Sequence, residues 1–205
     1  NYFLKIMMYK KNSTYIIAEI GINHEGNFSR AVNLIKAAKR SGVNAVKFQV
    51  FKPETLAREK SKKTTQQKKL TSKTMSLAQM WKKMALNYLQ LKKLKKLSKD
   101  LKLDFICSVF DEESLDLVTK LQVDTIKIAS SDITDHNLLK LIKKRAKKII
   151  FSTGLSTESE IRQAVKILGN RSTILHCVSS YPCPQSLANL ARIKTLKNKF
   201  KNSIG

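Results

Sequence analysis

Residues 103–130, LDFICSVFDEESLDLVTKLQVDTIKIAS, decide the fold class of this chain. The apolar run over Leu103–Val109 predicts a strand, the spacing of apolar residues over Glu112–Leu121 predicts a helix, and Asp124–Ser130 predicts a second strand. Two strands joined through a helix form a parallel βαβ unit, because a tight turn joins only antiparallel strands.

The same alternation of strand and helix continues on both sides of this unit. Further strands are predicted over Thr14–Gly21, Asn44–Val50, Lys148–Thr153 and Ser172–Val178, with the start of a seventh strand at Asn202–Gly205. Further helices are predicted over Ser29–Ser41, Asn137–Ala146, Glu158–Leu168 and about Leu187–Phe200, with a polar connection from Phe51 to about Thr74 and helical segments from there to Leu101. Six βα units in strict order require a parallel sheet, either doubly wound or closed into a barrel. Polar residues within the strands, and the lack of a GxGxxG motif after the first one, favour the barrel.

The predicted fold is therefore α/β, an incomplete TIM (β/α)8 barrel over residues 14–205 that follows an N-terminal tail, residues 1–13. A complete barrel of eight units usually needs about 250 residues. We therefore expect the 205 residues to be a fragment of a longer enzyme, and Met7 or Met8 is a plausible native start.

The chain is strongly basic, with 40 Lys and Arg against 15 Asp and Glu, a net charge of +25. Such a charge suggests a polyanionic partner, but here the lysines are spread over nearly every helical segment, as in a protein of lysine-biased composition. Leu86, Leu89, Leu94, Leu97 and Leu101 form a helical stripe with lysines on the other faces, and no aromatic residues are interleaved for stacking on bases. Nucleic acid is therefore an unlikely partner.

Other compositional features point to an ordinary cytoplasmic protein. No uncharged run is apolar enough for a membrane span, and no signal peptide precedes the first strand. The three cysteines show no zinc-type spacing, which indicates reduced thiols.

Polar side chains within the predicted strands indicate the chemistry. Glu19 lies near the end of the first strand, Lys47 and Gln49 share one face of the second, and Lys127 interrupts the fourth. Hydroxyl residues end or follow several strands: Ser108, Ser130, Ser152 and Ser179. In a barrel these strand ends meet at one mouth, where two lysines and several hydroxyls would bind a small anion with phosphate and carboxylate groups. Glu19 and Asp132 could handle protons or the hydroxyls of a polyol.

Simpler explanations exist for each residue. Either lysine could pair with an acid or extend its amine to solvent. His176 is more consistent with a hydrogen-bonded core residue than with a metal ligand, and His136 with a helix start at the surface. Cys107 and Cys177 fit small apolar core positions. The segment Asn23–Glu25 could contact substrate or only shape the first loop.

Several short motifs in register resemble the sialic acid synthase (N-acetylneuraminate synthase) family. They are Ala18–Gly26 (AEIGINHEG), Val46–Gln49 (VKFQ), Phe105–Asp111 (FICSVFD), Lys127–Ser130 (KIAS), Phe151–Gly154 (FSTG), Leu175–Cys177 (LHC) and Tyr181–Pro184 (YPCP). Each motif is weak alone, but their order and spacing over about Tyr15–Gly205 are specific.

The resemblance implies a barrel enzyme, homodimeric in the family, that condenses phosphoenolpyruvate with N-acetylmannosamine or a related amino-sugar and releases phosphate. A divalent metal, Mn²⁺ or Mg²⁺, would orient the sugar aldehyde. The phosphoenolpyruvate site would comprise Lys47, Ser108, Lys127, Ser130, Ser152 and Ser179, and the amino-sugar would meet Glu19, Gln49, Asp132 and Tyr181. Ser108, Asp132 and Ser179 stand where many relatives have Thr, Glu and Asn, which we expect to tune specificity.

The family's two metal-binding histidines lie on the last two strands, and none of His24, His136 or His176 matches them. We therefore expect the metal ligands beyond Gly205, a doubtful dimer, and little activity from these residues alone. The alternatives are another phosphoenolpyruvate- or phosphosugar-using barrel lyase or aldolase, and a basic protein that binds RNA or anionic membranes.

Overall fold

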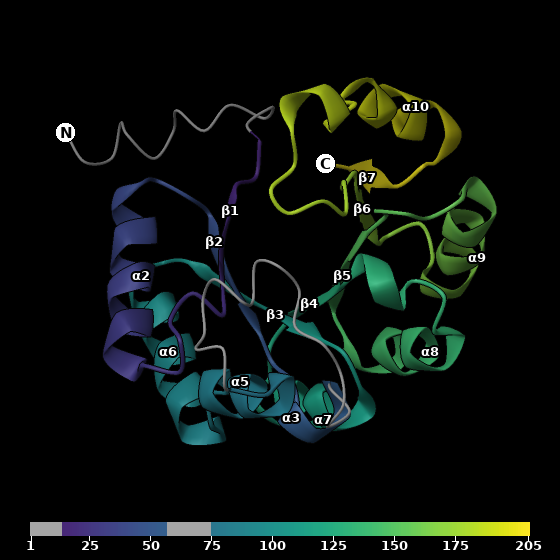
Figure 1. Ribbon diagram of the computed structural model, residues 1–205. Coiled ribbons are helices and arrows are strands. Elements are labelled where there is room, and N and C mark those ends of the chain that lie inside the picture. The colour runs from purple at the N-terminus through teal and green to yellow at the C-terminus, as the bar shows by residue number, and fades with distance from the viewer. Residues whose placement is uncertain (1–13, 57–74) are drawn as a thin grey trace.

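The computed structural model describes residues 14–56 and 75–205, so the predicted tail over residues 1–13 and part of the predicted polar connection lie outside the described residues. Seven parallel strands pair in chain order into one curved sheet, with helices along its outer side (Figure 1). The strands are β1 (Ile17–Gly21), β2 (Ala45–Gln49), β3 (Asp104–Val109), β4 (Thr125–Ile128), β5 (Lys148–Ser152), β6 (Thr173–Leu175) and β7 (Ser203–Ile204). Within the described residues the sheet stays open between β1 and β7, so the predicted incomplete barrel is confirmed.

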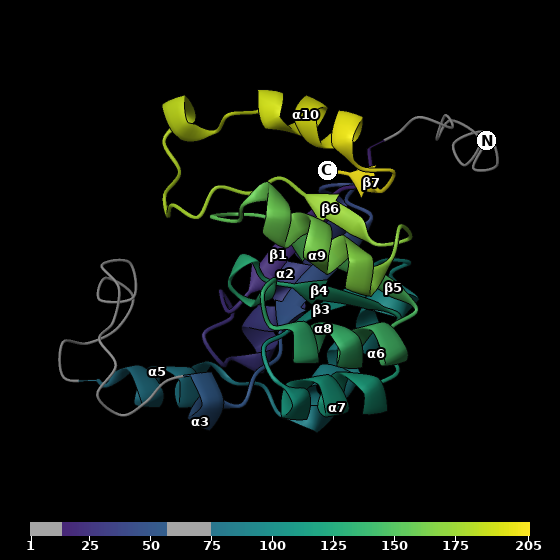
Figure 2. The same cartoon turned by 90° about the vertical axis from the view of Figure 1, so that its right-hand side faces the viewer.

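Helices connect successive strands, as the βα pattern predicts. They are α2 (Phe28–Arg40), α3 (Pro53–Leu56), α5 (Leu77–Met84), α6 (Tyr88–Asp100), α7 (Glu112–Lys120), α8 (His136–Arg145), α9 (Glu158–Leu168) and α10 (Ala191–Lys199). Short 3-10 helices cover Ser130–Asp132 and Gln185–Leu187. Figure 2 shows α3, α5 and the connection between β6 and α10 extending on the same side of the sheet.

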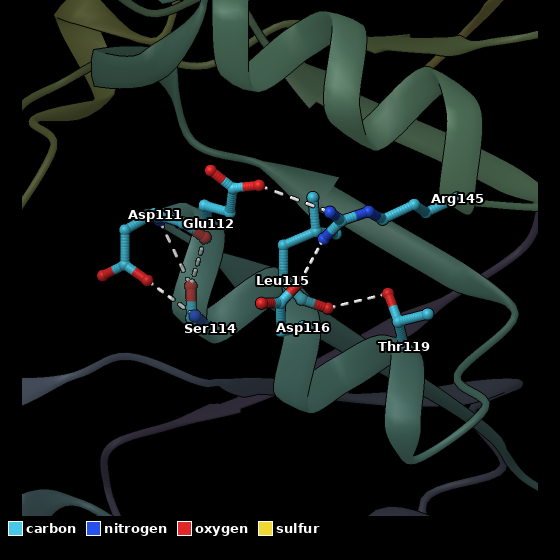
Figure 3. A network of polar contacts seen from close by, with 7 residues as sticks. All are labelled: Asp111, Glu112, Ser114, Leu115, Asp116, Thr119 and Arg145. Atoms are coloured by element: carbon cyan, nitrogen blue, oxygen red, sulfur yellow. Dashed lines mark hydrogen bonds and ion pairs between the residues drawn. The ribbon is translucent and has the colours of Figure 1, made fainter.

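Side-chain caps explain where the helices begin. At α7, the Asp111 carboxylate accepts a hydrogen bond from the Ser114 N–H at 2.6 Å, which satisfies a donor that the first helical turn leaves unpaired (Figure 3). Arg145, the last residue of α8, reaches across to α7, where it binds the carboxylates of Asp116 and Glu112. These contacts join two neighbouring helices of the outer layer.

The two faces of the sheet bury different side chains, because successive residues of a strand point to opposite faces. The outward residues pack under the helices in the main core, which includes Phe48, Cys107, Ile126 and Phe151, all almost fully buried. Inward residues in the lower half of the strands form a small separate cluster: Ala45, Ile106 and Ile150, with Ile17 and Leu175 against them. The barrel interior therefore contains an apolar layer, although the first inward residues of β3 to β6 are polar: Asp104, Thr125, Lys148 and Thr173.

Three sequence-based details are wrong. The last predicted helix begins only at Ala191, because a long irregular connection follows the short strand β6. Leu89 does not belong to the apolar stripe of α6, since it is 66% exposed, whereas Leu91 is buried. Lys95 is not on a purely solvated face: its ammonium donates to the carbonyl oxygens of Leu121 and Gln122, both at 2.8 Å, and so satisfies the end of α7.

The helices and the cysteines bear on two further predictions. None of the helices in the described ranges is long and apolar enough to cross a bilayer. All three cysteines are free thiols: Cys107 is buried, Cys177 is partly buried and Cys183 is exposed. Cys107 packs in the core as a small apolar group, as predicted.

Candidate active site at the carboxyl ends of the strands

The inward positions at the carboxyl ends of the strands carry polar side chains. In the strand register Glu19 lies opposite Lys47, Gln49 opposite Ser108, and Ser108 opposite Lys127. These residues therefore share the inner face of adjacent strands β1 to β4. Ser152, almost fully buried, ends β5 on the same face.

Lys47 has specific partners on both sides. Its ammonium forms an ion pair with the Glu19 carboxylate and lies 3.2 Å from the Ser108 hydroxyl oxygen. The Lys47 side chain is only 13% exposed, whereas that of Glu19 is 45% exposed. Pairing with an acid, the simpler explanation, therefore applies to Lys47, but the acid itself is accessible from the mouth of the barrel.

Lys127 lies in a different environment. Within the described residues it forms no ion pair with a carboxylate. Burial, and secondarily repulsion from Lys47, lower the pKa of Lys127 from its ordinary value to about 8. Lys47 on β2 and Lys127 on β4 both belong to the inner face of the sheet. A cavity shared by the two lysines stays a prediction, and the charges of Glu19 and Asp132 partly offset the effects of burial and of Lys47 on the Lys127 pKa.

Hydroxyl groups surround Gly154, just after β5. The Ser130 hydroxyl oxygen accepts a hydrogen bond from the Gly154 N–H at 2.9 Å. A methyl group at Gly154 would lie 2.4 Å from the Ser179 hydroxyl oxygen and 3.1 Å from that of Ser130. Ser130, Gly154 and Ser179 line a cavity of about 400 Å³ together with Ser131, Thr134 and Ser156. Gly154 thus leaves the space in which hydroxyls from three connections meet, a role the sequence analysis did not assign.

Asp132 lies at the end of the 3-10 helix that follows β4. Its Oδ1 atom accepts a hydrogen bond from the Ser131 hydroxyl at 2.8 Å, and its buried Oδ2 atom has no partner within the described residues. Burial raises the pKa of the Asp132 carboxyl group, while the nearby charge of Lys127 acts in the opposite direction. A buried carboxyl group of this kind binds its proton more tightly than an exposed one.

The remaining predicted residues divide into two groups. Gln49 approaches Glu19, since a methyl group at Gly21 would lie 2.7 Å from the Glu19 Oε1 atom and 3.5 Å from the Gln49 Nε2 atom. Tyr181 lies on the connection after β6 with 77% of its surface exposed, so the structure does not bring it against the inner face.

The three histidines take the structural positions expected from their surroundings. His176 is partly buried, and its Nε2 atom lies 2.8 Å from the Ala188 carbonyl oxygen. His136 is exposed at the start of α8. In the first loop His24 is 1% exposed, and Glu25 pairs with Arg30 at 2.8 Å, so these two residues shape the loop and do not line the mouth.

The donor set does not fit a metal ion. In residues 14–56 and 75–205, no group of three or more His, Cys, Asp and Glu side chains could hold one. Glu19 is engaged with Lys47, and Asp132 stands on another strand connection.

A parallel barrel wall with two convergent lysines at its carboxyl end is typical of enzymes that act on small anionic substrates. The NeuB family model matches residues 34–205, and the chain belongs to this family of sialic acid synthase-like enzymes.

Named relatives agree with the family match. The chain is 39% identical over 198 residues to the N,N'-diacetyllegionaminic acid synthase of Campylobacter jejuni, covering 94% of this chain and 59% of the relative. It is 32% identical over 197 residues to the N-acetylneuraminate-9-phosphate synthase of Drosophila melanogaster, covering 93% and 52%. A sialic acid synthetase structure from Leptospira borgpetersenii superposes with a TM-score of 0.83 at 32% identity, covering 95% of this chain and 64% of that one. The chain thus spans between half and two thirds of these proteins.

Proposed function

We propose that the whole protein containing these residues condenses phosphoenolpyruvate with N-acetylmannosamine or a related amino-sugar, giving a nine-carbon sugar acid and phosphate. The observation that carries this proposal is the pair Lys47 and Lys127 on one inner face, with Lys127 free of any carboxylate partner among the described residues. Relatives named for legionaminic, neuraminic and pseudaminic acid derivatives support the product class.

The residues suit the charges of this reaction. Phosphoenolpyruvate carries a carboxylate and a phosphate, which the two lysines neutralise while Ser108, Ser130, Ser152 and Ser179 donate hydrogen bonds. These contacts hold the enol carbon in position for attack on the sugar aldehyde. Fixed groups cost no reorganisation when the new carbon–carbon bond forms.

Two carboxyl groups suit the later proton transfers. The aldehyde oxygen gains negative charge and needs a proton, for which we assign Asp132 as the donor, since its buried Oδ2 atom has no other partner among the described residues. The phosphate-bearing carbon becomes positive and takes up water, whose proton passes to Glu19. The bond between that carbon and the phosphate oxygen then breaks while the remaining hydroxyl proton passes to the departing phosphate, which leaves the ketone of the sugar acid. The assignment of Glu19 rests on its 45% exposed side chain beside Lys47.

The test is a phosphate-release assay of the whole protein with both substrates and Mn²⁺ or Mg²⁺, with the product identified by mass. Lys127→Met should abolish phosphoenolpyruvate binding in calorimetry and leave the circular dichroism spectrum unchanged. Lys140→Met, at an exposed position of α8, is the matched control and should bind normally. No condensation with any N-acetylated amino-sugar, or normal binding by Lys127→Met, would contradict the proposal.

One observation favours a second candidate function. With a pKa of about 8, part of the Lys127 amine is neutral near pH 7.5 and can form a Schiff base with a carbonyl compound, as in a class of aldolases. Borohydride reduction in the presence of pyruvate should then leave a covalent adduct on Lys127. Absence of that adduct, with phosphate release intact, favours the condensing enzyme.

The finer properties stay predictions for the whole protein: a cytoplasmic location, a homodimer, a divalent metal, and little activity from residues 1–205 alone. The assay above, repeated with these residues only, tests the last of them.

A further inference from the structure

The first connection of the barrel, Gly21–Asn27, is a compact turn next to the candidate site. Backbone hydrogen bonds of 2.9 Å close it at Asn23, Glu25 and Asn27. Gly26 has a φ of +75°, and a methyl group there would lie 2.0 Å from the carbonyl oxygen of Lys83 in α5. The turn is therefore pressed against a neighbouring helix and tolerates little change.

His24 lies at the centre of this turn. It is 1% exposed, and its Nδ1 atom accepts a hydrogen bond from the Gly26 N–H at 3.0 Å. An accepting Nδ1 atom requires that the proton of the neutral ring be on Nε2, which has no hydrogen-bond partner among the described residues. Burial lowers the pKa of His24, which favours the neutral ring, while the nearby Gly21 backbone acts in the opposite direction.

Two contacts connect His24 with the candidate site. The imidazole stacks on the Phe48 ring, with centroids 6.0 Å apart and planes at 27°. Phe48 stands between Lys47 and Gln49 on β2, with its own side chain on the outer face. The backbone partner of Phe48 on β1 is Gly21, because the register shifts between Glu19 and Gly21. His24 therefore lies on the outer face of the sheet, next to the register shift between Glu19 and Gly21.

Gly21 connects the turn that contains His24 with the Glu19 side chain. It has a φ of +53°, and the space a side chain would occupy there is taken by the Glu19 carboxylate and the Gln49 amide. Moving the Gly21 backbone by a fraction of an ångström would therefore change the position of Glu19 against Lys47. The imidazole itself does not reach the inner face.

We infer that His24 is a positioning residue, which holds the Gly21–Gly26 turn and the β1 irregularity so that the Glu19 carboxylate is aimed into the mouth of the barrel. The inference rests on the proposed function for its kinetic consequence, and on the geometry alone for its effect on Glu19. The proposed anion site and substrate class do not depend on this inference about His24.

Two substitutions separate the hydrogen bond from the packing. His24→Phe keeps an aromatic ring against Phe48 but cannot accept from the Gly26 N–H. His24→Asn loses the ring but keeps an acceptor oxygen at the position of Nδ1. In the whole protein, His24→Phe should lower kcat about tenfold or more, because small misplacements of a reacting group have effects of that size. The affinity for phosphoenolpyruvate should stay within about twofold, and His24→Asn should recover most of the lost kcat.

A spectroscopic measurement tests the inference without enzyme activity. The ¹³C shift of the Glu19 carboxyl group, assigned with Glu19→Gln, should move in His24→Phe and return toward the wild-type value in His24→Asn. His136→Phe, at an exposed position, is the matched control and should change neither shift nor kcat. An unchanged Glu19 shift, or a loss of phosphoenolpyruvate affinity parallel to the loss of kcat, overturns the inference. An inactive wild-type protein overturns the proposed function instead, and the Glu19 shift still decides the role of His24.

Discussion

Two layers of the barrel interior come from the same strands yet have opposite character. The lower layer, near the strand starts, is the apolar cluster of Ala45, Ile106 and Ile150. The upper layer follows two residues later on each strand, with Lys47, Ser108 and Ser152. Side chains two residues apart on a strand share a face, so both layers point inward. The two layers differ only in their position along the strands. We expect the lower layer to serve stability and the upper layer to serve chemistry, as in complete barrels.

Truncation of the lower layer should give the largest effect. Ile106→Ala removes a side chain that is 1% exposed and should lower the free energy of unfolding by about 3 kcal/mol, through lost burial and the cavity left behind. Urea unfolding of the whole protein measures it, with Ile16→Ala, at a position 52% exposed, as the matched control. If the folded fraction of Ile106→Ala also lost affinity for phosphoenolpyruvate, the two layers would not be independent.

Replacement of an upper-layer lysine should weaken substrate binding and leave the stability nearly unchanged. Lys47→Met should weaken phosphoenolpyruvate binding about a hundredfold, about 2.7 kcal/mol, because one of two charges opposite the anion is lost. The stability should change little, since the Glu19 carboxylate left without its partner is 45% exposed and can be hydrated. Calorimetric titration and thermal unfolding of the same sample measure both. A large loss of stability would place Lys47 with the structural residues.

Filling the space at Gly154 should have an intermediate effect. The methyl group of Gly154→Ala would lie 2.4 Å from the Ser179 hydroxyl oxygen, so that hydroxyl must move away. We expect about a tenfold loss of phosphoenolpyruvate affinity, or about 1.4 kcal/mol. Gly42→Ala adds the same methyl group where no atom lies within 4 Å, at a strained φ of +76°, and should affect stability only. Equal binding losses in the two variants would exclude a specific role for Gly154.

The smallest effect is a pH dependence from Lys127. Because the free protein has a Lys127 pKa of about 8, the affinity for phosphoenolpyruvate should fall about threefold between pH 7.5 and 8.5, as the amine loses its charge. The stability should move in the opposite direction. Between about pH 8 and 10.5 the unfolded chain still holds this proton while the folded chain has lost it, so stability rises with pH.

Urea unfolding at pH 7.5 and 9.5 measures this change. The wild-type protein should gain stability relative to Lys127→Met as the pH rises. If the free energy of unfolding changed equally with pH in the two proteins, the Lys127 pKa would not be lowered.

Much of the fold follows from local patterns. The predicted helix over Glu158–Leu168 agrees with α9 to the residue, because its apolar residues recur with the helical period and Thr157 caps its first turn. The predicted bounds of β2, β3 and β5 agree within one residue, because each strand is a short apolar run. The connection after β6 was not predicted, since nothing local indicates that residues between His176 and Ala191 form only a short 3-10 helix.

The sequence by itself determined which residues could bind an anion, because a charged residue inside an apolar strand has few other uses and its spacing assigns it to one face. Only the tertiary structure decided how these residues combine. The pairing of Lys47 with Glu19, the unpaired state of Lys127 among the described residues, the meeting of hydroxyls at Gly154 and the burial of His24 all join segments that are distant along the chain or separated by a turn. Such contacts depend on strand register and on desolvation, and neither quantity is encoded in the spacing of residues alone.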